Sequence, residues 1–257
     1  MLINLLKSNQ VLYLKILDSS LFNFISKLRN GTIYQIRNKV FNFYKEILKD
    51  YPNGKVVDIG ASIGNLSYFF LKMGYKVLSI EGSPKRFNIL TKRFKYSKNF
   101  NSLNLIISDK KGDIDFFENL NNPGLSSIDK KWKDITETNF NYVNKIITLT
   151  SDTLDNILKP LNNVVYLKID VEGAEELVLK TLNIPVPIIS IESNLPYYFV
   201  ETKRCLEKFN TLSENYKYNY AINYKLVDNN WMTYNEIIEK ISHINISIDI
   251  FARIPKS

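Results

Sequence analysis

The chain has 257 residues, of which 45% are hydrophobic and 13% aromatic, so it can form a full-sized core. Its formal charge is +8, but the basic residues form no dense run, which disfavours a protein whose only role is to bind nucleic acid. Cys205 is the only cysteine and His243 the only histidine of the sequence. This excludes an intramolecular disulfide, a cysteine-based zinc site and a histidine-rich metal site. We expect a cytoplasmic protein of a reducing compartment, with no signal peptide or transmembrane segment, because charged residues interrupt its apolar N-terminal patches.

Residues 1–54 predict a helical N-terminal extension. Apolar side chains recur at near-helical spacing over residues 5–17, 21–28 and 40–48, and a turn at 51–54 ends the region. The interpretation we favour is that these helices pack on the following domain or on a second copy of the chain, giving a homo-oligomer. The alternative is a substrate lid or a contact with a membrane surface.

From residue 55 to residue 257, strand patterns alternate with helix patterns, which predicts a single α/β domain. Strands are expected at 55–59, 76–80, 103–107, 164–170 and 187–192, with a closing pair at 216–222 and 246–252. Helices are expected at 65–73, 85–96, 152–158, 174–182 and 199–209. The stretch 110–150 has two strand-like pieces separated by a polar loop. This alternation predicts a mostly parallel sheet with helices on both faces.

Ligands of such sheets bind at the carboxyl ends of the strands, so the residues that follow the strands are the first candidates for a site. These residues are Gly60, Glu81, Ser108, Asp109, Asp170, Glu172, Glu192 and Asn194.

The stretch VVDIGASIG, residues 56–64, reads as a strand, a glycine turn and the start of a helix. The dinucleotide fingerprint G-x-G-x-x-G requires a middle glycine, and Ser62 stands in its place. Asp58 precedes the turn, where a carboxylate repels a pyrophosphate but suits an ammonium group. Glu81, 21 residues after Gly60, is placed to accept the hydroxyl hydrogens of a ribose. Together these features favour S-adenosylmethionine over NAD.

A family resemblance appears in the order of several blocks between residues 55 and 195. They read VVDIGASIG, IEGSPKRFNIL, ISDKKGDIDFF, GLSSI, TLDNIL, YLKIDVEGAEELVLKTL and PIISIESN. This order resembles the FkbM family of methyltransferases, and LKIDVEGAE with the upstream TLD is its most specific part. The resemblance implies a Rossmann-like class I methyltransferase fold with a seven-stranded sheet. It also implies O-methylation by S-adenosylmethionine, with a sugar hydroxyl in a glycan or a glycosylated metabolite as the expected acceptor.

The cofactor residues follow from the turn and the strand ends. We expect Asp58 to contact the methionine ammonium group and Glu81 to bind the ribose. Ser108 or Asp109 is expected to read the adenine amino group. Gly82 stands where the family usually has proline. The full set of expected cofactor-binding residues is Asp58, Gly60, Ala61, Ser62, Gly64, Glu81, Gly82, Ser108, Asp109 and Asp170.

The catalytic candidates are Lys168, Asp170 and Glu172, because the acceptor hydroxyl must lose a proton. The interpretation we favour is that Asp170 or Glu172 is the general base. In the alternative, Asp170 and Glu192 hold a Mg²⁺ ion with Glu172 or Asn194. His243 is not expected to be the base. The expected substrate-binding residues are Ser126, Ser127, Glu192 and Asn194.

Two other functions remain open, namely an NAD-dependent oxidoreductase and a basic protein that binds nucleic acid or a membrane surface. RNA methylation is disfavoured, because DVEG follows the strand at 164–170 where amino-methylating enzymes carry N/D-P-P-Y/F. The expected partner is therefore a small-molecule or glycan acceptor. The aromatic residues Trp132, Trp231, Tyr197 and Tyr198 are expected in the core more than on a sugar ring.

Overall fold

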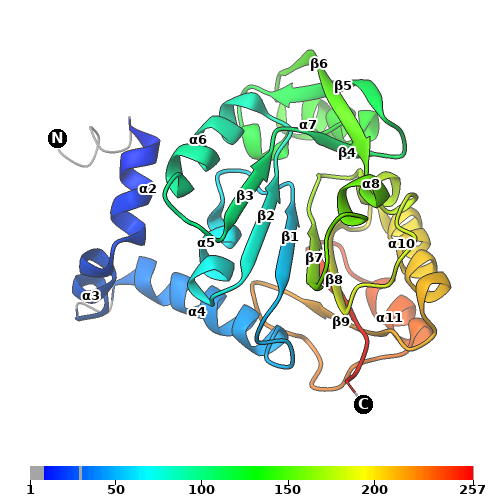
Figure 1. Cartoon of the computed structure of the whole chain (residues 1–257). Coiled ribbons are helices and arrows are strands. Elements are labelled where there is room, and N and C mark those ends of the chain that lie inside the picture. The colour runs from blue at the N-terminus through cyan, green and yellow to red at the C-terminus, as the bar shows by residue number, and fades with distance from the viewer. Residues whose placement is uncertain (1–8, 29–30, 257) are drawn as a thin grey trace.

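The chain folds around a seven-stranded sheet, seen in a computed structural model that describes residues 9–28 and 31–256. The strands lie in the order β3-β2-β1-β7-β8-β10-β9, and β10 alone runs in the direction opposite to the other six (Figure 1). Their bounds are β1 (Lys55–Ile59), β2 (Lys76–Ile80), β3 (Phe100–Leu103), β7 (Val164–Ile169), β8 (Ile188–Asn194), β9 (Lys217–Ala221) and β10 (Ser247–Arg253). The predicted seven-stranded, mostly parallel sheet is confirmed.

Helices cover both faces of this sheet, because successive residues of a strand point to opposite sides. Val57 of β1 belongs to one apolar core and Val56 to another. The core around Val57 takes in residues of α8 (Leu154–Leu158), α9 (Glu175–Leu179), α10 (Phe199–Leu212) and α11 (Tyr234–Ile241). The core around Val56 takes in residues of α4 (Thr32–Ile47) and α5 (Asn65–Lys72), beside which α6 (Pro84–Phe94) packs. The predicted helical layers on both faces are confirmed.

A second, smaller sheet lies beyond the carboxyl ends of the main strands (Figure 1). Its order is β4-β6-β5, with β4 (Ile106–Ser108), β5 (Gly112–Asn119) and β6 (Asn144–Thr153). The prediction of one strand over residues 103–107 is wrong, because the chain leaves the main sheet after β3 and enters the small one as β4. At the break, Asn104 Nδ2 donates to the carbonyl oxygens of Glu81 and Gly82, both at 2.8 Å, so a side chain takes the place of strand pairing.

The connection between β5 and β6 contains a helix that the sequence interpretation left as a loop. It runs through the 3₁₀ turn η1 (Pro123–Leu125) into α7 (Lys130–Phe140). Asp129 caps this helix by accepting from Trp132 N at 2.7 Å, and Trp132 and Thr136, one turn apart, are its buried residues. Only two side chains of this helix are buried, and one of them is a threonine. The spacing of apolar residues alone therefore did not indicate a helix.

The N-terminal region is helical over its described residues, as α2 (Gln10–Asp18), α3 (Ser20–Leu28) and α4. The part of that prediction that falls on residues 1–8 lies outside the described residues. Four residues of α4 are buried in the core around Val56, so this helix packs on the sheet. Within the described ranges, no helix is both long and apolar enough to cross a bilayer.

Candidate active site

A cavity of about 310 Å³ lies at the carboxyl ends of β1, β2 and β7, where the parallel strands predict a ligand site. Its walls come from the turn after β1, the end of β2, the loop at 123–128 and the turn after β7. Most residues predicted for the cofactor and for catalysis line it, together with two of those predicted for the substrate, Ser126 and Ser127. The former are Asp58, Gly60, Ala61, Ser62, Glu81, Gly82, Lys168, Asp170 and Glu172.

The glycine turn is held where the ends of β1 and β7 come close. Gly60 has φ +76°, and a Cβ there would lie 1.7 Å from the carbonyl oxygen of Asp170, so only glycine fits. The backbone N–H groups of Gly60 and Ala61 both donate to the carbonyl oxygen of Ile80, at 2.9 and 3.0 Å. Ser62, at the middle position of the turn, has φ +57°. The turn is therefore held to β2 by two backbone hydrogen bonds and lies in close contact with the end of β7.

Glu81 is a buried carboxylate at the end of β2, with 7% of its surface exposed. Oε2 accepts from Ser62 N at 2.7 Å and Oε1 accepts from Ser83 N at 2.8 Å. Burial raises the pKa of Glu81, and these two backbone donors oppose the shift. Each oxygen keeps a further lone pair, so a fixed carboxylate faces the cavity with acceptors for hydroxyl groups.

Asp58 and Lys168 form a buried ion pair beneath the turn. Asp58 Oδ2 accepts from Ser67 Oγ at 2.7 Å, and Lys168 Nζ lies 3.7 Å from Asp58 Oδ1 and 2.8 Å from Asp170 Oδ2. Burial raises the pKa of Asp58, and Lys168 opposes that shift. Burial would lower the pKa of Lys168, but the carboxylates of Asp170 and Asp58 outweigh it and raise that pKa. Asp58 Oδ1 is buried and has no hydrogen-bond partner within the described part of the chain.

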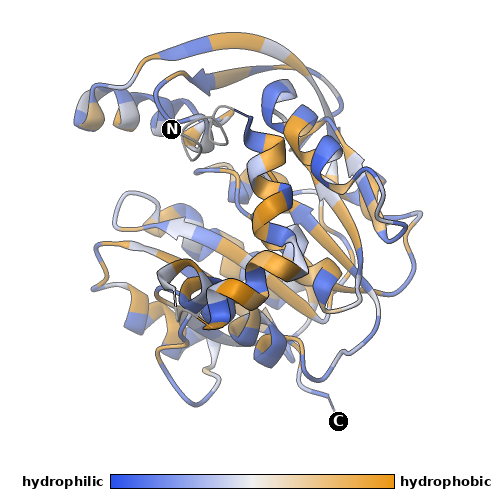
Figure 2. Cartoon of the chain, turned by 90° about the vertical axis from the view of Figure 1, so that its left-hand side faces the viewer, coloured by the Kyte–Doolittle hydropathy of each residue, from blue (hydrophilic) through white to orange (hydrophobic). Residues whose placement is uncertain are grey.

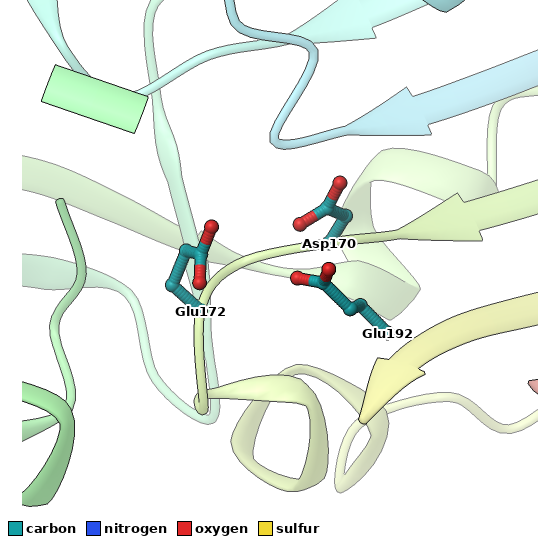
Figure 3. A group of neighbouring side chains, drawn as sticks. All are labelled: Asp170, Glu172 and Glu192. Atoms are coloured by element: carbon teal, nitrogen blue, oxygen red, sulfur yellow. The ribbon is translucent and has the colours of Figure 1, made fainter. Parts of the chain in front are cut away.

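Three carboxylates meet at the other end of the cavity (Figure 3). Asp170 follows β7, Glu172 lies in the next turn, and Glu192 comes from β8, which is parallel to β7. One oxygen of each lies within 4.8 Å of the others. Figure 3 shows the three side chains facing a common space. The sequence prediction that the ends of these two strands bring their acids together is confirmed.

The pKa values of the three carboxyl groups are shifted in different directions. Burial would raise the pKa of Asp170, but the charge and hydrogen bond of Lys168 lower it. Burial, followed by the charge of Asp170, holds the pKa values of Glu172 and Glu192 well above their ordinary range. Within the cluster, ionisation is therefore favoured at Asp170 and disfavoured at Glu172 and Glu192.

The turn that carries Glu172 is strained and is braced from three sides. Glu172 has φ +57°, and Gly173 follows with φ +95°. A Cβ on Gly173 would lie 2.6 Å from the hydroxyl oxygen of Tyr198. Glu175 Oε1 accepts from Val171 N at 2.9 Å, and Ser127 Oγ donates to the carbonyl oxygen of Val171 at 3.1 Å. These contacts hold a sparsely populated backbone conformation, which is frequent at functional sites.

Ser126 and Ser127 line the cavity, and both hydroxyl groups also hold the loop together. Ser126 Oγ accepts from Asn119 N and donates to the carbonyl oxygen of Pro123, both at 3.0 Å. Ser127 Oγ accepts from Asp129 N at 2.9 Å in addition to its bond to Val171. Their role in binding an acceptor stays a prediction.

Several lining residues were missed by the sequence interpretation. Ile106 and Phe116 give the cavity an apolar wall. The sequence did not predict this wall, because it did not indicate the break between β3 and β4 that brings Ile106 to the cavity. Arg86 of α6 also lines the cavity and donates to Ser62 Oγ, and burial lowers its pKa. Pro84 at the start of α6 indicated the helix, but the spacing could not show that Arg86 turns toward the site.

Other predicted residues lie outside the lining of this cavity. Ser108 Oγ donates to the carbonyl oxygen of Lys110, and Asp109 is exposed, 4.0 Å from Lys180 Nζ. Gly64 has φ +80° and begins α5, where a Cβ would meet the ring of Phe94 at 2.4 Å. Glu192 belongs to the acid cluster but does not line the cavity, and Asn194, the last residue of β8, shares a hydrogen bond with Glu172.

The remaining candidates lie as follows. Trp132 and Tyr198 are buried, and Trp231 is partly buried beneath the guanidinium group of Arg253 at 4.1 Å, whereas Tyr197 is exposed. The expectation of a core position thus holds for the first three. His243 is exposed in the turn after α11 and does not line the cavity.

Comparison with known proteins adds the family. Residues 58–240, more than half of the chain, match the methyltransferase FkbM domain. The chain belongs to the FkbM methyltransferase family. The activity of this FkbM methyltransferase is therefore methyl transfer that depends on S-adenosylmethionine. The family membership also decides against the NAD-dependent oxidoreductase, in line with Ser62 in place of the middle glycine.

Solved structures similar to this FkbM methyltransferase include several methyltransferases of low identity. An rRNA methylase from Streptococcus thermophilus is 12% identical with a TM-score of 0.42, over 84% of this chain and 94% of its own. Fibrillarin from Aeropyrum pernix, with bound S-adenosylmethionine, is 9% identical with a TM-score of 0.41, over 77% and 66%. The plantazolicin methyltransferase BpumL is 10% identical with a TM-score of 0.43, over 96% and 99%. Likeness this weak carries no information about the substrate of this chain. A comparison with curated proteins finds no match.

The cavity of this FkbM methyltransferase fits a cationic nucleoside. Asp58 Oδ1 is a buried acceptor that has no hydrogen-bond partner among the described residues, although Lys168 Nζ lies 3.7 Å away, so it can accept from an ammonium group of a ligand. The lining carries the carboxylates of Asp58, Glu81, Asp170 and Glu172 against the cations Arg86 and Lys168, an excess of negative charge that suits a positive donor. The apolar wall suits a flat base.

Proposed function

We propose that this methyltransferase transfers the methyl group of S-adenosylmethionine to a hydroxyl oxygen, and that the acceptor is a sugar. In this proposal Glu81 accepts the ribose hydroxyl hydrogens, Asp58 Oδ1 accepts from the methionine ammonium group, and Ile106 and Phe116 enclose the adenine. The burial of Glu81 and its two backbone donors support its role, because a preorganised carboxylate loses little entropy on binding. When bound, S-adenosylmethionine supplies an electrophilic methyl group on a positively charged sulfur.

The acid cluster carries the proposal of O-methylation. A sugar hydroxyl has a pKa far above 7, so its proton must leave as the new carbon–oxygen bond forms. Glu172 takes this proton, because it lines the cavity and its pKa is well above the ordinary range of a carboxyl group. Asp170, which Lys168 keeps ionised, stays a fixed negative charge and orients the acceptor. The bond between the methyl carbon and the donor sulfur would break as the carbon–oxygen bond forms, with S-adenosylhomocysteine as the leaving group. The acceptor ends as a methyl ether, and the proton ends on Glu172.

The alternative route is a Mg²⁺ ion held by Asp170, Glu172 and Glu192. The separation of their oxygens supports this route, because oxygen ligands around one ion lie at similar distances from each other. The direct base remains the route we favour, because Lys168 already balances Asp170. Chelator treatment separates the two. If activity survives prolonged dialysis against EDTA, the base route holds; if activity is lost and returns only with Mg²⁺, the ion route replaces it.

The acceptor class is tested with a panel. The full chain is incubated with S-adenosylmethionine and, separately, with sugar nucleotides, glycans, RNA oligonucleotides and peptides, and each product is examined by mass spectrometry. We expect a methyl addition only among the sugars, with a carbon chemical shift typical of a methyl ether. Methylation of RNA or of a peptide nitrogen alone would contradict the proposal. The Glu172→Gln variant serves as the inactive control.

A further inference from the structure

The helix α3 presents an apolar face that nothing in the described chain covers. None of its residues is buried, and Leu21, Phe24 and Leu28 are 67%, 61% and 71% exposed. With Ile25 they recur at the spacing of one helical face. Figure 2 shows orange residues on the N-terminal helices that face the viewer. Ile33 and Ile36 at the start of α4, which contacts α3, are exposed too. A soluble monomer rarely exposes such a cluster without a partner.

The exposed face belongs to a segment that is firmly attached. Asp18, at the end of α2, accepts from Arg37 of α4 at 2.9 Å and from Arg93 of α6 at 2.7 and 3.0 Å. Arg93 Nη1 also donates to the carbonyl oxygen of Ile63 at 2.8 Å, beside the glycine turn. Leu14 of α2 is buried. The helices on either side of α3 are thus anchored to the catalytic domain, and α3 is held with its apolar side chains outward.

The charged side chains of α3 and α4 around this apolar face are positive. The sequence has no acidic residue between Asp18 and Glu46, whereas Lys27 and Lys39 are exposed in that stretch. In a symmetric dimer the same patch would face itself, so these lysines would approach each other without a carboxylate between them. An anionic bilayer surface offers apolar depth for the phenylalanine and leucines and negative headgroups for the lysines.

We propose that α3, with the first turns of α4, docks this enzyme on an anionic membrane surface. The apolar side chains of Leu21, Phe24 and Leu28 enter the boundary between headgroups and acyl chains, and Lys27 contacts the headgroups. The helix lies along the surface, because nine residues are too few to cross a bilayer.

The test is cosedimentation of the full chain with vesicles of phosphatidylcholine, with and without phosphatidylglycerol. We expect binding to the vesicles that contain phosphatidylglycerol, weakened by added salt. Phe24→Asp should reduce the partition coefficient about tenfold or more, since it puts a charge into the apolar boundary. Lys27→Glu should reduce it at least about fivefold, the contribution of one basic residue near an anionic surface.

The controls make the same chemical changes elsewhere. Ile184→Asp and Lys240→Glu alter exposed residues that lie outside the N-terminal helices, and they should leave the partition unchanged. Circular dichroism and activity on a soluble acceptor verify that each variant is folded. The proposal is overturned if the wild type binds neither vesicle, or if the controls lose as much binding as Phe24→Asp. A dimer seen by light scattering, lost in Phe24→Asp and without vesicle binding, would assign the face to a second copy.

Discussion

Lys168 Nζ lies 2.8 Å from Asp170 Oδ2 and 3.7 Å from Asp58 Oδ1, so a single buried ammonium group joins the two ends of the cavity. Asp58 belongs to the end where we place the methionine group, and Asp170 to the acid cluster. Lys168 is only 5% exposed, so water cannot readily replace its ammonium group as the partner of either carboxylate.

The first prediction concerns Lys168→Met. Removing the ammonium group leaves the buried carboxylate of Asp58 and the half-buried carboxylate of Asp170 uncompensated, so the free energy of unfolding should fall by about 3–5 kcal/mol. The pKa of Asp170 should rise, because Lys168 is what lowers it. Urea unfolding measures the first effect. Lys131→Met, at an exposed lysine paired with Glu201, should cost about 1 kcal/mol or less. An equal loss in both variants would show that the buried pair has no special role.

The second prediction concerns the pH dependence of methyl transfer. Burial and the charge of Asp170 raise the pKa of Glu172, and a general base acts in its ionised form. The rate should therefore rise with pH until Glu172 is ionised. Glu172→Gln should lower kcat by about 10²- to 10⁴-fold and abolish this rise. Glu176→Gln changes a nearby glutamate of α9 that pairs with Arg204 and does not line the cavity, and it should leave both the rate and its pH dependence unchanged. A flat pH profile in the wild type would point away from Glu172 as the base.

The third prediction concerns stability. Burial raises the pKa of Glu175 to about 7, so the folded state binds more protons than the unfolded state between the ordinary carboxyl range and pH 7. The stability that this group contributes is complete at low pH and is lost as the pH rises through about 7. Glu175→Gln, which keeps an acceptor for Val171 N, should remove roughly 2–3 kcal/mol of the fall between about pH 5 and pH 8. Denaturant unfolding of both proteins at the two pH values measures this difference.

The sequence predicted the sheet well because strand and helix periodicities there are long and separated by clear turns. Asp58, Glu81 and Asp170 were placed by one rule, that parallel strands present their carboxyl ends at a common edge. Ser108 and Asp109 lie outside the lining of the cavity, because the chain leaves the main sheet at Asn104 and places them at the end of β4 in the second sheet. The local sequence does not indicate that switch. A single polar residue such as Asn104 within an apolar run is compatible with one continuous strand.

The pairing of Lys168 is a second feature that the sequence left open. Alternation along β7 placed Lys168 and Asp170 on one face, but the third partner, Asp58, comes from a neighbouring strand whose register with β7 was unknown. In the structure Asp58 lies directly opposite Lys168 in the parallel ladder. Arg86 was missed for the same reason, because its neighbours Ser62 and Glu172 come from two other parts of the chain.

The most direct test of the account is calorimetry with S-adenosylhomocysteine, which reports on the donor end of the cavity without requiring the acceptor. The wild type should bind it, and Glu81→Gln should bind about 10- to 100-fold more weakly, since an ionised acceptor for the ribose hydroxyls is lost. Asp109→Asn, outside the cavity, should bind as the wild type does. A wild type that does not bind, or a Glu81→Gln variant that binds with unchanged affinity, would contradict the assignment of this cavity to the methyl donor.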